Sequence, residues 1–159
     1  MTGIIMAGRT GGAFAAQLGT MEVNEEIDAL RTLGINPMEF LVLPRMLALM
    51  LMMPLLCLYA DLMGILGGMI VSVGFYGLNG TMYIQRTNAA VGVDDLFIGL
   101  FLGAVFGYLV AMAGCLRGMQ CGRSASGVGD AATSAVVTSI IAIVIATAVI
   151  TIICDVIGI

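Results

Sequence analysis

Residues 96–116 read LFIGLFLGAVFGYLVAMAGCL, twenty-one residues in a row without a charged side chain. A helix needs about 20 apolar residues to cross the hydrocarbon core of a bilayer, so this stretch is long enough to span a membrane. Residues 131–154, AATSAVVTSIIAIVIATAVITIIC, form a second uncharged run. This run is rich in β-branched residues, but an isolated strand cannot satisfy its backbone hydrogen bonds in lipid. Both runs therefore predict transmembrane α-helices.

A third apolar stretch covers residues 46–78 and is interrupted only by Pro54 and Asp61. As one straight helix it would measure about 50 Å, which is well beyond the thickness of the hydrocarbon core. We therefore expect it to tilt, protrude or bend, with the bend at Pro54 or at a glycine cluster. The cluster consists of Gly64, Gly67 and Gly68.

The first segment, residues 1–20, differs from these three runs. It is rich in Gly and Ala and carries Arg9 near its middle, which is typical of the end of a span. We expect further sequence upstream of Met1, because this helix is too short and too small in side chain to insert well alone. The predicted fold class is an all-α polytopic membrane protein. It has three full transmembrane helices, a partial N-terminal one and a short cytoplasmic helix.

The composition excludes several classes of function. Apolar residues make up 60% of the chain and charged residues 10%, and the net charge is −4. The six basic residues are all arginines, too few to build the basic surface that a nucleic acid requires. The chain has no histidine, so the commonest general base and the commonest neutral metal ligand are missing. We expect no enzyme activity, no cofactor and no metal site.

A glycine-rich segment and the cysteines are also expected to have no catalytic or ligand-binding role. The glycine-rich residues 122–130 lack the Gly-Lys-Ser/Thr ending of a phosphate-binding loop, so ATP hydrolysis would have to come from a partner. The four cysteines match no C-x-x-C pair, and we interpret them as small buried hydrophobic residues. They are Cys57, Cys115, Cys121 and Cys154.

The arginines predict the orientation of the chain. If the connection 20–45 lies in the cytoplasm, then the 117–130 loop is also inside, whereas the 79–95 loop and the C-terminus are outside. This orientation leaves only Arg86 outside and agrees with the positive-inside bias. The arginines at or toward the cytoplasm are then Arg9, Arg31, Arg45, Arg117 and Arg123.

Small residues recur four positions apart on three of the segments, which lets helix backbones approach closely in lipid. The rows are Gly3, Ala7, Gly11, Ala15 and Gly19; Gly99, Gly103, Gly107 and Ala111; and Ser134, Thr138, Ala142 and Ala146. We predict packing faces along these rows, and one of them is a candidate seam for a homodimer. The alternative is that Gly and Ala are simply common in membrane helices.

Residues 20–37, TMEVNEEIDALRTLGINP, separate the first two apolar stretches. Asn24 is a favourable N-cap, acidic residues follow it, and Gly34 and Pro37 are typical of a helix end. The pattern predicts a short helix of about ten residues within 22–34. Its apolar residues recur at helical spacing, so that one face is apolar and the other strongly acidic. These apolar residues are Val23, Ile27 and Leu30, with Leu33 close by.

This acidic helix is a candidate docking site for another protein. A helix that rests on lipid usually carries Lys and Arg on its polar face, whereas anionic headgroups would repel these acids. The alternative is a solvated helix that only connects two spans. The candidate docking residues are Glu22, Glu25, Glu26, Ile27, Asp28, Leu30 and Arg31.

Several motifs along the chain together resemble one known family. They are AGRTGGAFAAQLGTM (residues 7–21), NEEIDAL (24–30), VLPR (42–45), PLL (54–56), GILGG (64–68) and GVGDAATSAVV (127–137). This ordered set covers essentially the whole chain and resembles the MlaE/YrbE permeases of ABC-type phospholipid transporters linked to MCE proteins.

The resemblance implies a single permease domain over residues 1–159 and a dimeric protein of the inner membrane, with its outer side in the periplasm. Its partners would be cytoplasmic ABC ATPase subunits, a periplasmic MCE-domain lipid-binding protein and phospholipid. The segment 22–34 matches the family's coupling helix, which seats in the ATPase. Family members are longer at the N-terminus by an interfacial helix and further membrane-spanning sequence, which contribute to the lipid pocket and the dimer seam.

Three polar residues are candidates for a lipid path or an intramembrane polar site: Arg9, Gln17 and Asp61. Gln17 stands where the family usually has Glu, which would weaken an ion pair or shared network with Arg9. A carboxylate within a span is costly and therefore often functional, although Asp61 could instead make a structural hydrogen bond or lie near the outer headgroups. Asp94 and Asp95 are expected to cap the following span, and contact with the MCE protein is the alternative.

Two other classes of function stay open. One is a small oligomeric ion or proton channel or carrier that uses Asp61, and the other is a purely structural membrane subunit. The acidic helix at 22–34 separates them from a transporter, because a channel needs no acidic docking face.

Overall fold

The computed structural model describes residues 1–77 and 79–157, with the backbone alone described for Val93 and Asp94. Three long helices dominate the fold: α4 (Leu43–Tyr76), which continues the π-helical segment η2 (Met38–Val42), α6 (Val93–Met119) and α7 (Ala125–Ile157). Each is long and apolar enough to cross a membrane, and each matches one predicted span. The described residues include no β-strand. The predicted all-α polytopic membrane fold is confirmed.

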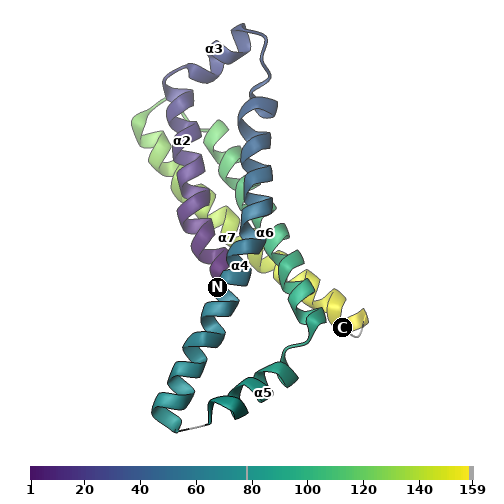
Figure 1. Ribbon diagram of the computed structural model, residues 1–159. Coiled ribbons are helices and arrows are strands. Elements are labelled where there is room, and N and C mark those ends of the chain that lie inside the picture. Colours follow the sequence, from purple (N-terminus) through teal and green to yellow (C-terminus); the bar gives the residue numbers. More distant parts are fainter. Residues whose placement is uncertain (78, 158–159) are drawn as a thin grey trace.

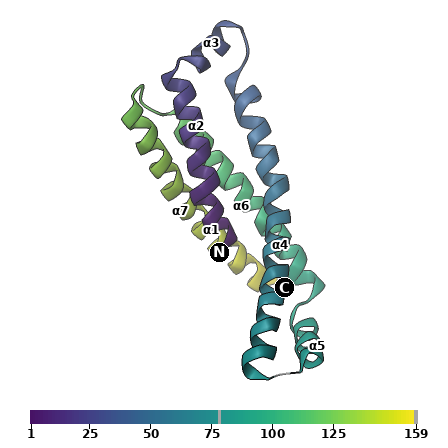
Figure 2. The same cartoon turned by 60° about the vertical axis from the view of Figure 1, so that its left-hand side comes forward.

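The N-terminal segment is a helical run with one wider turn in its middle. It consists of α1 (Thr2–Met6), the π-helical η1 (Ala7–Gly11) and α2 (Gly12–Val23). The run begins about midway along the bundle and packs on α6 and α7 (Figures 1 and 2). It therefore accompanies the other helices over only part of their length, as expected for a partial span.

Helix α4 remains continuous through Pro54 and through the glycine cluster. Its axis changes direction along its length, so that its second half leads away from α6 (Figures 1 and 2). It ends at Gly77, whose positive φ of 61° is a conformation that glycine adopts at no steric cost. Leu78, the last residue of the predicted span, lies outside the described residues.

The N-terminal helical run packs through its small-residue row. Every member of the row is buried: Gly3, Ala7, Gly11, Ala15 and Gly19. Helix α6 meets this row with two glycines that were not singled out in the sequence. A Cβ atom on Gly114 would lie 2.8 Å from the Gly11 carbonyl oxygen, and one on Gly118 would lie 3.0 Å from the Ala15 carbonyl oxygen. These backbones therefore approach too closely for any larger residue.

Helix α6 also packs closely on α4, but only along part of its length. A Cβ atom on Gly107 would lie 2.6 Å from the Leu49 carbonyl oxygen, and one on Gly103 would lie 3.2 Å from the Pro54 Cα. Gly99 belongs to the same predicted row, yet nothing lies within 4 Å of a Cβ built there. The row stops serving as a packing face at Gly99 because α4 and α6 have diverged at that level (Figure 1).

The packing face of α7 differs from the predicted one by one position. The buried residues are Ala131, Ala135, Ser139 and Ile143. The predicted row, Ser134, Thr138, Ala142 and Ala146, lies beside it and is only half-buried. The Ser139 hydroxyl donates to the Ala135 carbonyl at 2.7 Å, so this buried polar group is satisfied within its own helix.

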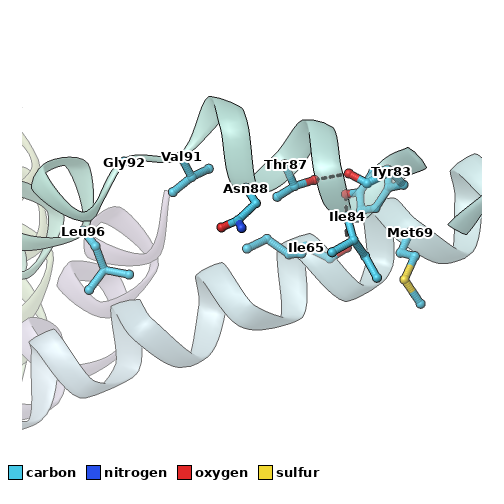
Figure 3. A pocket seen from close by; sticks show the side chains of 9 residues that line it. All are labelled: Ile65, Met69, Tyr83, Ile84, Thr87, Asn88, Val91, Gly92 and Leu96. Carbon is cyan, nitrogen blue, oxygen red and sulfur yellow. Dashed lines mark hydrogen bonds between the residues drawn. The ribbon is translucent and has the colours of Figure 1, made fainter. Parts of the chain in front are cut away.

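The predicted loop at 79–95 contains a helix, α5 (Gly80–Ala90), which bridges the diverging ends of α4 and α6 (Figure 1). None of its residues is buried, which explains why no apolar pattern revealed it. Its Tyr83 hydroxyl donates to the Ile65 carbonyl of α4 at 3.2 Å. A cavity of about 480 Å³ lies between α4, α5 and the start of α6 (Figure 3). It is lined by Ile65, Met69, Tyr83, Ile84, Thr87, Asn88, Val91, Gly92 and Leu96.

The start of α6 is held by one hydrogen bond between a side chain and the backbone. The backbone N–H of Gly92, the N-cap residue, donates to the Asp95 carboxylate at 3.0 Å. The structure thus confirms the capping role expected of Asp95, whereas the side chain of Asp94 lies outside the described part of the chain.

Candidate functional site

The candidate docking helix lies at the end of the bundle opposite α5 (Figures 1 and 2). It is α3 (Glu26–Thr32), separated from α2 by a sharp turn. Glu25 makes this turn with a φ of 60°, the single positive φ of a non-glycine residue in the described chain. Asn24 ends α2 and does not cap α3, so the prediction of Asn24 as the N-cap is wrong. The N-cap is Glu25, with no capping hydrogen bond from its side chain.

The other end of α3 closes as the sequence predicts. Gly34 has a φ of 76°, and its N–H donates to the Arg31 carbonyl at 3.1 Å. The Ile35 N–H donates to the Leu30 carbonyl, also at 3.1 Å. This pair of bonds is the Schellman arrangement, which satisfies the last carbonyls of a helix and turns the chain sharply. Helix α3 is therefore short because both of its ends are fixed by the backbone.

The two faces of α3 differ in burial as well as in charge. Ile27 is fully buried and Leu30 is half-buried, so these side chains attach the helix to the bundle. Glu25 and Glu26 are exposed on the outer side. Leu33, expected near the apolar face, is 74% exposed, because the helix ends before it. The outer surface of α3 therefore combines two carboxylates with an exposed leucine.

Asp28 does not face outward as a free carboxylate. One of its oxygens accepts a hydrogen bond from Arg123 at 2.7 Å and the other accepts one from Arg31 at 3.3 Å. Asp28 and Arg31, both predicted as docking residues, are therefore paired within the chain. The local sequence gave no sign of Arg123, because it lies 95 residues further along.

The connection between α6 and α7 lies against the end of α2. A Cβ atom on Gly19 would lie 3.2 Å from the Cys121 sulfur and 3.5 Å from a methyl group of Val128. The Ser124 hydroxyl accepts a hydrogen bond from the Gly127 N–H at 3.1 Å and so caps the first turn of α7. This connection is thus held on both sides, by α2 and by the start of α7.

Two arginines near this end were not predicted as site residues. The Arg45 guanidinium lies over the Phe14 ring, with its central carbon 5.4 Å from the ring centroid. Arg45 Nη1 and Arg117 Nε are buried and have no hydrogen-bond partner among the described residues. Arg45 belongs to the motif VLPR, whose significance in the sequence came only from the family resemblance.

A groove rich in methionine lies between the start of α4 and the end of α6. Its volume is about 500 Å³. It is lined by Met38, Val42, Met46, Met112, Cys115, Leu116, Met119 and Gln120. Flexible thioethers suit a variable apolar occupant, although they also serve as ordinary lipid-facing side chains.

The structure does not bring the three predicted intramembrane polar residues together. Arg9 in η1 and Gln17 in α2 are both exposed, and no hydrogen bond joins them. Asp61 is exposed on α4. In the described part of the chain, both salt bridges involve Asp28, so neither Arg9 nor Asp61 forms one there.

The sequence predicts buried cysteines and no metal site. Within residues 1–77 and 79–157, no group of three or more potential ligands lies close enough to hold a metal ion. Cys115 is buried, whereas the other three cysteines are only half-buried. All four are free thiols.

Several known proteins similar to this chain are named as probable ABC transporter permeases. The probable ABC transporter permease proteins of Rickettsia typhi and of Synechocystis sp. are each 40% identical to it over 131 residues, which are 82% of this chain. These residues cover 51% and 50% of the two relatives. The chloroplast protein TRIGALACTOSYLDIACYLGLYCEROL 1 of Arabidopsis thaliana is 36% identical over 131 residues, covering 82% of this chain and 37% of that protein.

This chain thus spans about half the length of the bacterial relatives it matches. A family model described as Permease MlaE matches residues 1–153, which is nearly the entire sequence. The chain therefore belongs to the MlaE permease family.

Proposed function

We propose that this chain forms part of the membrane permease of an ABC-type phospholipid transporter, in which ATP hydrolysis on a separate cytoplasmic subunit drives lipid movement. Family membership and relatives named as ABC transporter permeases support the transporter class. A relative named after a galactolipid supports a lipid substrate. The glycine-rich residues 122–130 form the end of the α6–α7 connection and the first turns of α7, so they are used in a helix junction.

Helix α3 is the observation that carries this proposal. It is a separate, short, acidic helix that lies beyond the ends of the membrane helices (Figure 1). Ile27 holds it on the bundle, while Glu25, Glu26 and Leu33 are left exposed. Acidic groups around an exposed apolar residue fit a partner whose docking cleft is basic at its rim and apolar inside. An ATPase seated there could push on α2 and η2, which are the covalent neighbours of α3.

The orientation of the molecule and its other partners follow from the same proposal. Helix α3 and the α6–α7 connection lie in the cytoplasm, while α5 and the end of α7 lie at the outer side of the inner membrane. A periplasmic MCE-domain protein would then receive or deliver lipid at the α5 end. Residues 1–159 contribute one permease domain, and two copies form the transporter.

A channel or carrier that uses Asp61 is the main alternative. The exposed position of Asp61 on α4 gives it no polar path through the described chain, whereas α3 is fully formed. Asp61→Asn would abolish transport if this carboxylate carried the ion. Under the proposal, the variant keeps ATP-dependent lipid movement.

The proposal is tested by reversing the charge of α3. The double variant Glu25→Lys and Glu26→Lys is made in the full-length protein and reconstituted with its ATPase in vesicles. We expect the lipid moved per ATP hydrolysed to fall about tenfold or more, because like charges at an interface cost several kcal/mol. Thermal stability should not change, since both side chains are exposed.

The matched control is Asp155→Lys, which removes an exposed carboxylate at the opposite end of the molecule. This variant should retain the coupling of the wild-type protein. Normal lipid movement by the Glu25→Lys and Glu26→Lys double variant would remove α3 from the mechanism.

A further inference from the structure

The elements of this protein are joined by few polar side chains. Among the described residues, two side-chain hydrogen bonds join positions more than four residues apart. One is the bond from Tyr83 to Ile65 at the α5 end. The other is the ion pair from Arg123 to Asp28, which joins the α6–α7 connection to α3 at 2.7 Å. The remaining contacts between elements are made by packing, which includes the Arg45 guanidinium of α4 over the Phe14 ring of α2.

The ion pair adds to the attachments that the chain and the buried Ile27 give α3. The chain itself ties α3 to α2 through the turn at Glu25 and to η2 through residues 33–37. Arg123 lies between α6 and α7, next to Ser124, which caps α7. The pair therefore connects α3 to a hairpin of two long helices that does not adjoin it in sequence.

We propose that Arg123 is a positioning residue, which acts through Asp28 to make α3 move together with the α6–α7 hairpin. Without this pair, α3 is held by its covalent links to α2 and η2 and by the burial of Ile27, and a push on α3 reaches α6 and α7 only indirectly, through α2 or through η2 and α4. Asp28 thus binds another part of the same chain, while Glu25 and Glu26 remain exposed to a partner. The inference rests on the proposed function only in that α3 is taken as the helix that receives the push.

The strength of this link suits a reversible connection. The Arg123 and Asp28 side chains are 63% and 37% exposed, so water and salt weaken their attraction. An exposed ion pair changes the equilibrium constant for local opening of the segments it joins by about two- to five-fold. The link can therefore hold α3 in the resting protein and still yield when a partner with basic groups approaches Asp28.

The test measures hydrogen–deuterium exchange of the full-length protein. The variants are Arg123→Glu, Asp28→Arg and the combination of both, which restores an ion pair with reversed charges. We expect each single change to raise amide exchange in α3 and in residues 121–128 by about two- to five-fold, and the combination to restore it. Raising the salt to about 1 M should loosen the wild-type protein in the same two places.

Arg86→Glu is the matched control, because Arg86 is an exposed arginine of α5 at the opposite end of the bundle. It makes the same change in charge and should leave exchange in α3 unaltered. The proposal would be overturned if the single changes left amide exchange unaltered. It would also be overturned if the combined variant did not restore the wild-type exchange. Restoration by charge reversal would show that the two side chains act through their mutual attraction and not separately.

A second measurement on the same variants separates this inference from the proposed function. The ratio of lipid moved to ATP hydrolysed should fall in both single variants and recover in the combination. If exchange changes but this ratio does not, Arg123 does not position α3 for coupling, while the proposed function stands. If the wild-type protein moves no lipid with ATP, the proposed function fails, and the exchange data still decide whether the link exists.

Discussion

The two ends of this molecule are built differently. Toward the α3 end, the N-terminal helical run and α4 each pack on α6 with their backbones in contact, and Ile27 and the Asp28–Arg123 pair hold the short helix α3 on top. At the α5 end, α4 and α6 diverge, α5 buries none of its residues, and a cavity of about 480 Å³ separates the three helices. The α3 end therefore combines close backbone packing on α6 with the methionine-rich groove of about 500 Å³, whereas the α5 end is held by a few contacts.

Under the proposed function, the two ends of the bundle have different tasks. A short helix transmits force best when it rests on closely packed elements. Toward the α3 end, α6 packs closely on the N-terminal helical run and on α4. A site that admits flexible lipid chains needs elements that can separate at small cost, and the contacts of α5 are of that kind. The comparison therefore predicts large effects for substitutions at the α3 end and small, local effects at the α5 end.

The largest effect is expected at Ile27, the buried anchor of α3. Ile27→Ala removes most of a fully buried side chain and should cost about 2–5 kcal/mol at this site. Because α3 is short, this loss should release it, and hydrogen–deuterium exchange across residues 26–32 should approach that of an unfolded segment. Leu33→Ala is the control, since Leu33 is 74% exposed, and it should leave this exchange unchanged.

A smaller loss of stability, which affects the whole protein, is expected from a substitution in the seam between α4 and α6. Gly107→Ala places a methyl group 2.6 Å from the Leu49 carbonyl oxygen, which forces the two helices apart. The expected loss of stability is about 1–3 kcal/mol, measured by unfolding of the purified protein in detergent.

The same change at Gly99 provides the control for the seam. Nothing lies within 4 Å of the new methyl group, so Gly99→Ala should be neutral or should gain up to about 1 kcal/mol from helix propensity. Equal losses at Gly99 and Gly107 would contradict the description of a packed end and an open end.

The smallest effect is expected at Tyr83, which holds α5 on α4. Tyr83→Phe removes the hydrogen bond to the Ile65 carbonyl and should cost about 0.5–1.5 kcal/mol. Since α5 buries no residue, the cost should appear locally, as faster cleavage by trypsin after Arg86, with no change in global unfolding. Tyr76→Phe, at an exposed tyrosine for which no hydrogen bond is seen, should cleave at the wild-type rate.

The parts of the fold that the sequence predicts are those set by local composition. The three spans follow from uncharged runs long enough to cross a bilayer, and their positions agree with α4, α6 and α7. The end of α3 follows from Gly34, whose positive φ only glycine adopts freely. Asp95 caps α6 for an equally local reason.

The parts that were missed depend on partners far away in the chain. Asp28 looks like a free carboxylate until the fold brings Arg123 beside it. The packing limit of the glycine row at Gly99 is set by the path of α4, which nothing in α6 encodes. Helix α5 lacks an apolar stripe because it rests on a cavity instead of a core. The αL turn at Glu25 was also missed, since a glutamate there is unusual.

The central claim is that an ABC ATPase sits on α3 and not on α5, and site-specific photo-crosslinking tests it most directly. A photoreactive amino acid is placed at Glu26 of α3 or at Gln85 of α5, both exposed positions, in the full-length protein in cells. The account predicts that the probe at position 26 captures a nucleotide-hydrolysing subunit and that the probe at position 85 does not. Capture of that subunit from position 85, or failure to capture it from position 26, would contradict the account.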